Sequence, residues 1–183
     1  MTFPRTGAML RDIAAEFPSF RLEEKRGQRL QHAIDRALRI LTLGGQHKYL
    51  THYHTVLWGV LYVPDGWHYM DDESRYVLLR HERVHLQQRR RYGDALMTFL
   101  YLVPFFPLGL AYGRARIEWE AYEETIAATL EIHGLERARA LEDEIVARFT
   151  GPDYGWMWPF PRTVRRWFAT ALADMVDSAA EPR

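Results

Sequence analysis

The sequence contains no cysteine among its 183 residues. Without thiols the chain can form no disulfide and can offer no thiolate to a metal, so a metal site would need histidine and carboxylate ligands. The charge is also balanced, with 24 basic and 24 acidic side chains. A formal net charge of zero removes the general electrostatic argument for a nucleic-acid partner.

Two kinds of segment are also missing. The N-terminal stretch MTFPRTGAMLRDIAAEF has no apolar run long enough for a signal peptide, and on this ground we expect a cytoplasmic location. No internal repeat or low-complexity linker interrupts the chain. Because 48% of the residues are apolar, the chain can bury a core. We expect one domain over 1–183, with its core at 22–177 and a frayed end at 178–183.

Hydrophobic periodicity predicts a mostly helical α+β fold with a small sheet. The expected helices cover 22–42, 72–92, 114–134, 135–149 and 162–177. Aromatic and β-branched residues predict a strand at 55–63, with a shorter strand near 49–53 before it. The helix at 72–92 opens with acidic residues and closes with arginines, which suits the helix dipole at both ends.

That helix carries the stretch LLRHERVHLQQ, in which His81 and His85 are four residues apart. Side chains so spaced lie on one face of a helix, and two imidazoles there can reach one metal ion. Glu82 lies about 100° round the helix, where it can address a water molecule without being a ligand. The alternative is two incidental histidines in a chain that has eight. The face is largely apolar, however, and buried neighbouring imidazoles need partners, which favours a metal.

The segment IEWEAYEET at 117–125 offers a third ligand. Glu118 falls in the centre of the apolar face of the predicted helix, where a lone carboxylate is costly unless it is paired or binds a metal. Glu120 falls about 200° away from Glu118, and Glu123 and Glu124 also fall on the polar face, as solvated charges. An ion pair between a buried Glu118 and an arginine remains the alternative to metal binding.

The pattern H-E-x-x-H followed by a second helix with E-x-x-A resembles the gluzincin group of zinc metallopeptidases, which are thermolysin-like, and small bacterial HExxH families. The resemblance rests on HERVHLQQ and EWEAY and covers about 55–130. It implies a zincin-like fold, Zn²⁺ bound by His81, His85 and Glu118, and Glu82 as the general base. Gluzincins commonly carry an acid four residues after the third ligand, whereas this chain has Tyr122 there.

The resemblance also implies a peptide or protein substrate that pairs with an edge strand just before the HExxH helix. TVLWGVLYV stands at that position and could equally be a core strand. A peptidase needs a donor to the oxyanion, and four side chains are candidates. Tyr112 and Tyr122 are favoured because they are nearest in sequence to Glu118, and Tyr154 and His68 stay open.

The eighteen residues at 95–112 carry no charge and reach the length of a membrane span. Pro104, Pro107 and Gly109 oppose one straight helix, and a span would separate Glu118 from the two histidines. We therefore expect core packing, with association at a membrane surface as the alternative.

The sequence predicts a hydrolase, a one-zinc metallopeptidase that cleaves peptides through an activated water. Two other classes stay open. One is a zinc-containing binding or regulatory protein whose cleft is blocked, and the other is a metal-free helical interaction protein. Metal analysis and incubation with peptides discriminate between the three classes.

Overall fold

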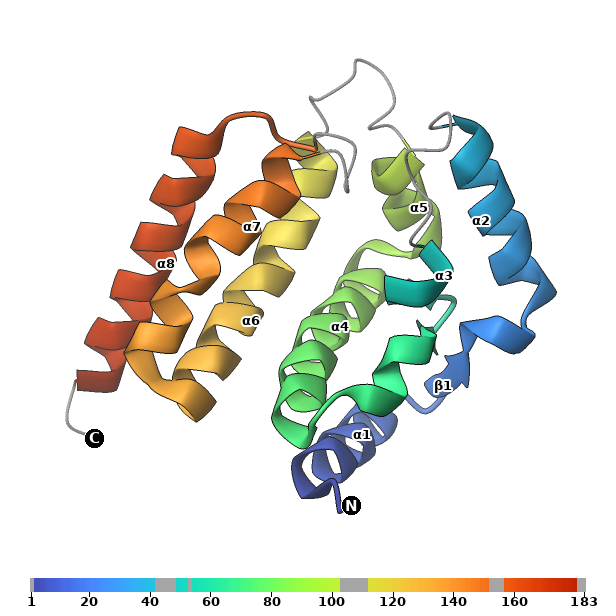
Figure 1. The fold of residues 1–183 in the computed structure, drawn as a ribbon, viewed down its shortest axis with the longest axis horizontal. Coiled ribbons are helices and arrows are strands. Elements are labelled where there is room, and N and C mark those ends of the chain that lie inside the picture. Colours follow the sequence, from blue (N-terminus) through green and yellow to red (C-terminus); the bar gives the residue numbers. More distant parts are fainter. Residues whose placement is uncertain (1, 42–48, 53, 103–111, 152–156, 181–183) are drawn as a thin grey trace. The chain divides into compact units, whose positions relative to one another are not determined.

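The structure is a computed structural model that describes residues 2–41, 49–52, 54–102, 112–151 and 157–180 (Figure 1). It is mostly helical with one small sheet, as the sequence predicts. The chain divides into two compact units, Met1–Leu86 and Gln87–Arg183, and the division falls inside helix α4 (Asp72–Tyr92). Each unit is described by itself here, and the expectation of a single domain stays a prediction.

The first unit contains a three-stranded sheet in the order β1-β3-β2. Strand β3 (Val60–Val63) is central and pairs in parallel with β1 (Arg21–Glu24) and antiparallel with β2 (Thr55–Leu57). The two-residue turn Trp58-Gly59 has positive φ at both positions, 49° and 81°, as a type I′ hairpin turn requires. The single strand predicted at 55–63 is therefore a hairpin. The sequence left open whether this segment is an edge strand or a core strand; in the described sheet β3, which leads to α4, is central and β2 is an outer strand.

Two other predictions for the first unit were wrong. Residues 22–28 do not begin a helix, because Leu22 pairs with Leu61 in the sheet and a 3₁₀ turn, η1 (Lys25–Gly27), follows. Helix α2 occupies only Arg29–Leu41. A helical turn, α3 (Tyr49–His52), replaces the expected strand near 49–53. Helix α1 (Pro4–Glu16) was not predicted at all.

The core of the first unit lies between the sheet, α1 and α4. It consists of apolar side chains from these elements and from η2 (Asp65–Tyr69): Met9, Ile13, Phe17, Val56, Leu61, Val63, Trp67, Leu79 and Leu86. The Asp72 carboxylate joins α1 to the start of α4, because it accepts bonds from the backbone N–H groups of Arg5 (2.9 Å) and Thr6 (2.8 Å). Desolvation raises the pKa of Asp72, but the bonds from Thr6 and Arg5 outweigh it and hold the pKa below its usual value.

The second unit is helical. Helices α6 (Tyr112–Arg139), α7 (Leu141–Thr150) and α8 (Pro161–Ala180) lie side by side, and α5 (Asp94–Leu102) contacts α6 (Figure 1). Their core is rich in aromatic side chains, with Phe149 fully buried against Trp119, Tyr122 and Trp167. Gly134 has φ 78° and breaks the helical path, as predicted, but α7 begins only after Ala140, so the single helix expected at 135–149 is divided.

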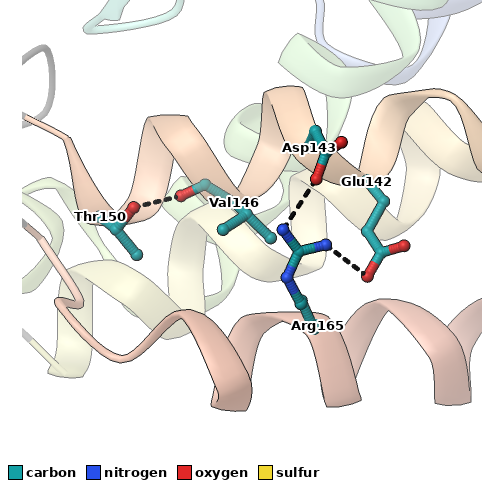
Figure 2. A network of polar contacts seen from close by, with 5 residues as sticks. All are labelled: Glu142, Asp143, Val146, Thr150 and Arg165. Carbon is teal, nitrogen blue, oxygen red and sulfur yellow. Dashed lines mark hydrogen bonds and ion pairs between the residues drawn. The ribbon is translucent and has the colours of Figure 1, made fainter.

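A polar clamp joins α7 to α8 at their exposed faces (Figure 2). The Arg165 guanidinium donates to Glu142 at 3.1 Å and to Asp143 at 2.8 Å. Farther along α7, the Thr150 hydroxyl donates to the backbone oxygen of Val146. The helix expected at 162–177 is confirmed: it is α8, which extends to Ala180.

Only part of the uncharged stretch 95–112 lies within the described residues. Its first part belongs to α5, where Met97 is buried while Leu96 and Phe99 are exposed. Residues 103–111 lie outside the described residues, so the choice between core packing and a membrane surface stays a prediction. Among the helices that the structure describes, none combines the length and the apolar character that crossing a membrane requires.

Candidate metal centre

Helix α4, which carries the H-E-x-x-H motif, has the limits that the sequence predicts. The Asp71 carboxylate accepts a bond from the backbone N–H of Ser74 at 2.7 Å, which is the side-chain cap expected at a helix N-terminus. Gly93, with φ 80°, follows the last helical residue. The motif therefore lies well inside a regular helix of 21 residues, where the spacing of its side chains follows helix geometry.

The two histidines of the motif share one face of α4. His85 is buried and His81 is half-buried, and their ring centroids are 5.0 Å apart at an interplanar angle of 78°. This is the arrangement predicted for residues four apart on a helix. Both rings thus offer nitrogen atoms to one small region beside α4.

Glu118 lies on α6, in a stretch of helix without a break before Gly134. It is 4% exposed, and its neighbours Ile117 and Trp119 are also buried. The predicted position of Glu118 on the buried face is confirmed. A carboxylate so placed needs a compensating charge or a metal ion.

The prediction that Glu120 and Glu123 are solvated charges was wrong. Glu120 is half-buried and accepts a bond from the Gln88 side chain at 2.9 Å. Glu123 accepts a bond from the Trp119 indole N–H at 2.6 Å. Desolvation raises the pKa of the Glu123 carboxyl, with the Trp119 bond opposing it. Helical phase on α6 alone could not show that Gln88 of α4 approaches this side of the helix.

Within the second unit, Gln88 fixes the last turns of α4 against α6. Its buried side-chain amide donates to the backbone oxygen of Ile117 at 2.9 Å and to Glu120 at 2.9 Å. Gln88 lies one turn after His85, and Ile117 directly precedes Glu118.

The ligand atoms of His81, His85 and Glu118 all lie within 4.8 Å of one another. Two imidazole nitrogens and one carboxylate oxygen are a donor set that Zn²⁺ accepts, with a fourth position left for water or substrate. The three residues proposed from the sequence are therefore brought together, and their types fit the metal.

Glu82, the proposed general base, is 8% exposed. A buried lysine that the sequence reasoning missed, Lys25, interacts with its charge. Burial lowers the pKa of Lys25 from 10.5 to about 7, while Glu82 and Asp35 act to raise it. No local pattern in the sequence connects Lys25 with Glu82, because 57 positions separate them.

The candidate oxyanion donors lie in different surroundings. Tyr122 is buried and its ring is 5.6 Å from Phe149, whereas Tyr112 is 56% exposed with its ring 5.4 Å from Trp158. His68 forms an exposed ion-pair contact with Glu24 at 2.9 Å. Tyr154 lies outside the described residues. The catalytic roles of these side chains stay predictions.

Comparison of the chain with protein-family models, with curated proteins and with solved structures gives no match. The function must therefore be inferred from the residues of the candidate metal centre themselves.

Proposed function

We propose that this chain is a zinc-dependent metallopeptidase of the zincin type, with His81, His85 and Glu118 as the metal ligands. The observation that carries the proposal is the mutual distance of their ligand atoms, all within 4.8 Å. Three ligands of types that suit Zn²⁺, two imidazoles and one carboxylate, come from two helices, and two of the three side chains are buried. The burial of Glu118 supports the proposal further, since a metal ion would offset the cost of that charge.

When bound, zinc supplies Lewis-acid chemistry: it lowers the pKa of a water molecule towards about 7 and polarises a carbonyl group. Glu82 is assigned the proton transfers, because it neighbours His81 on α4 and lies about 100° round the helix from it. As general base it takes one proton from the attacking water while the new C–O bond forms. It then gives that proton to the leaving nitrogen as the C–N bond breaks.

Substrate binding is assigned to β2. Among the described strands, β2 is an outer strand of the sheet and pairs with β3. A peptide that forms main-chain hydrogen bonds with an outer strand is bound with little dependence on its amino-acid sequence. The proposed substrate class is therefore an extended segment of peptide or protein.

One observation favours a second candidate, a zinc-containing protein without turnover. Glu82 is 8% exposed and interacts with the charge of the buried Lys25, so water has little access to its carboxylate. In this case the metal would support the fold or a binding surface and no peptide would be cleaved.

Elemental analysis of the purified protein and incubation with a quenched peptide library test both candidates. The proposal expects about one zinc per chain, cleavage that a chelator abolishes, and a Glu82→Gln variant that keeps zinc but loses cleavage by orders of magnitude. Glu136→Gln, on an exposed position of α6, is the matched control and should cleave normally. Zinc without cleavage would establish the second candidate, and a protein that binds no zinc would refute both.

A further inference from the structure

The second unit carries a groove that the proposed chemistry does not use. The groove lies between the second half of α6 and the second half of α8, and its volume is about 850 Å³. Leu130, one of the side chains that line it, lies about 120° round α6 from Glu118. The groove therefore faces a different side of α6 from the proposed zinc ligand. Its volume is within the range of protein sites that hold a ligand or an anchoring part of a partner.

The floor of the groove is apolar. It is lined by Leu130 and Leu135 of α6 and by Met175 and Val176 of α8, and each of these residues is half-buried. All four pack on the buried core of the second unit, so the part of their surface that remains accessible lies on the groove side. Neighbouring apolar side chains that stay accessible on two helices favour a partner with an apolar face of its own.

Acidic side chains accompany this floor. Glu123 and Glu131 of α6 and Asp174 of α8 line the groove, and among the described residues that line it none is basic. Desolvation raises the pKa of the half-buried Glu123 carboxyl, and the bond from the Trp119 indole opposes this effect. The charge of Asp174 acts to raise the pKa further. Two acids from two helices thus repel each other at the groove, and a cation bound there would offset the repulsion.

The acids are also spread along the groove. Glu123 and Glu131 are eight positions apart in an unbroken stretch of α6, which corresponds to about 12 Å along the helix axis. A single ammonium group cannot reach both positions. A partner helix covers the same length in about two turns, with an apolar stripe on one face and basic side chains beside the stripe. The length of the groove, its apolar floor and its negative charge are together complementary to such a helix.

We propose that the groove between α6 and α8 is a docking site for a basic amphipathic helix of a partner peptide or protein. The apolar stripe of the partner packs on Leu130 and Met175. Its lysines or arginines pair with Glu123, Glu131 and Asp174. This interaction goes beyond the proposed hydrolysis and does not depend on it, since the groove includes neither the proposed metal ligands nor the proposed general base.

Fluorescence anisotropy on the full chain tests the role of the acids. The probe is a labelled peptide of about 14 leucine and lysine residues, arranged so that it forms an amphipathic helix. We expect saturable binding to wild type, and an affinity that is lower by about tenfold or more in a triple variant, Glu123→Gln/Glu131→Gln/Asp174→Asn. The matched control removes three exposed acids outside the groove and should bind as wild type does: Asp12→Asn/Glu136→Gln/Glu144→Gln.

Two further probes use the wild-type chain, so they do not depend on the folding of any variant. A lysine tetramer, which has no apolar side chain, should bind at least about tenfold more weakly than the amphipathic peptide, because it cannot cover the floor of the groove. A peptide of the same pattern with glutamate in place of lysine should not bind. Absence of binding by the leucine–lysine peptide, or equal affinity for the lysine tetramer, overturns the proposal.

The variants give the remaining outcomes. Equal affinity of the leucine–lysine peptide for the triple variant and for its matched control would show that the acids of the groove do not recognise the partner, and would also overturn the proposal. Analytical ultracentrifugation of the chain alone tests a different occupant. A wild-type dimer that the triple variant does not form would identify a second copy of the chain as the occupant and refute the proposed partner, whereas monomers in both cases are the expected result.

Discussion

The Gln88 side chain donates a hydrogen bond to the backbone oxygen of Ile117 at 2.9 Å. This bond joins the last turns of α4 to α6 one residue before Glu118. Gln88 is 3% exposed, so water does not replace the bond if it is lost. The bond thus links a residue one turn after His85 to a residue beside the proposed third ligand.

Gln88→Leu should weaken both the fold and zinc binding. Removal of a buried amide that serves two acceptors costs about 1–3 kcal/mol in the free energy of unfolding. Because Gln88 is bonded to Ile117, directly before the proposed ligand Glu118, zinc affinity should fall by about 10–100-fold. Urea denaturation and competition with a zinc chelator measure the two effects. Thr98→Ala, at an exposed position of α5, is the control and should change neither. Unchanged zinc affinity in Gln88→Leu would show that this contact does not shape the site.

Two glutamates on α6, two residues apart, should differ sharply in their effect on zinc. Glu118→Ala removes a proposed ligand and should abolish stoichiometric zinc binding. Glu120→Ala should retain zinc and lose only its bond from Gln88, which contributes about 0.5–1.5 kcal/mol to stability. Elemental analysis after dialysis and urea denaturation separate the variants. Equal zinc loss in both would contradict the assignment of Glu118.

The parts of the site that the sequence predicted depend on helix geometry alone. Once each helix is recognised, its 3.6 residues per turn place His81 and His85 on one face of α4. The same periodicity places Glu118 on the buried face of α6. The environments of Glu120 and Lys25 depend on contacts with other elements. Gln88 donates to Glu120 from α4, and the buried Lys25 is influenced by the charges of Glu82 and Asp35, which lie far from it in the sequence. The hydrophobic periodicity of one segment does not predict its contacts with other elements of the fold.

The same distinction explains the errors in the fold. The segment at 22–28 has residues that favour a helix, but pairing with β3 overrides this weak local preference. The hairpin at 55–63 was not recognised because its turn is Trp-Gly, whereas Asn-Gly or Asp-Gly is the usual signal. Helix α4 was predicted correctly because acids, arginines and Gly93 mark both of its ends.

The buried Lys25 should make stability depend on pH. In the unfolded chain its pKa is near 10.5, and in the folded chain it is about 7. Between these values the unfolded chain binds a proton that the folded chain has released, so stability rises with pH. Well below pH 7 both states are protonated and the dependence disappears.

Urea denaturation at pH 7, 8 and 9 measures this dependence. Wild type should gain about 1 kcal/mol per pH unit over this range, and Lys25→Met should lack that gain. Comparison of the two slopes cancels the titration of groups that both proteins share. Parallel slopes for wild type and Lys25→Met would show that Lys25 keeps an ordinary pKa in the folded chain.

The hairpin turn between β2 and β3 should be improved by a substitution at Trp58. This residue has φ 49°, a left-handed conformation that is costly for a bulky side chain, and the residue is 64% exposed. Asparagine tolerates this conformation and is common at the first position of a type I′ turn. We expect Trp58→Asn to raise the free energy of unfolding by about 0.5–1 kcal/mol.

Trp58→Ala is the matched control for this prediction, because it also removes the ring but retains the cost of positive φ, so it should bring no gain. Gly59→Ala should lower stability by about 1–2 kcal/mol, since Gly59 has φ 81° and an added Cβ would lie 3.3 Å from the Ser19 hydroxyl oxygen. Urea denaturation of the three variants gives the order. If Trp58→Asn and Trp58→Ala are equally stable, backbone conformation does not limit the turn, and the exposed ring itself then accounts for any change from wild type.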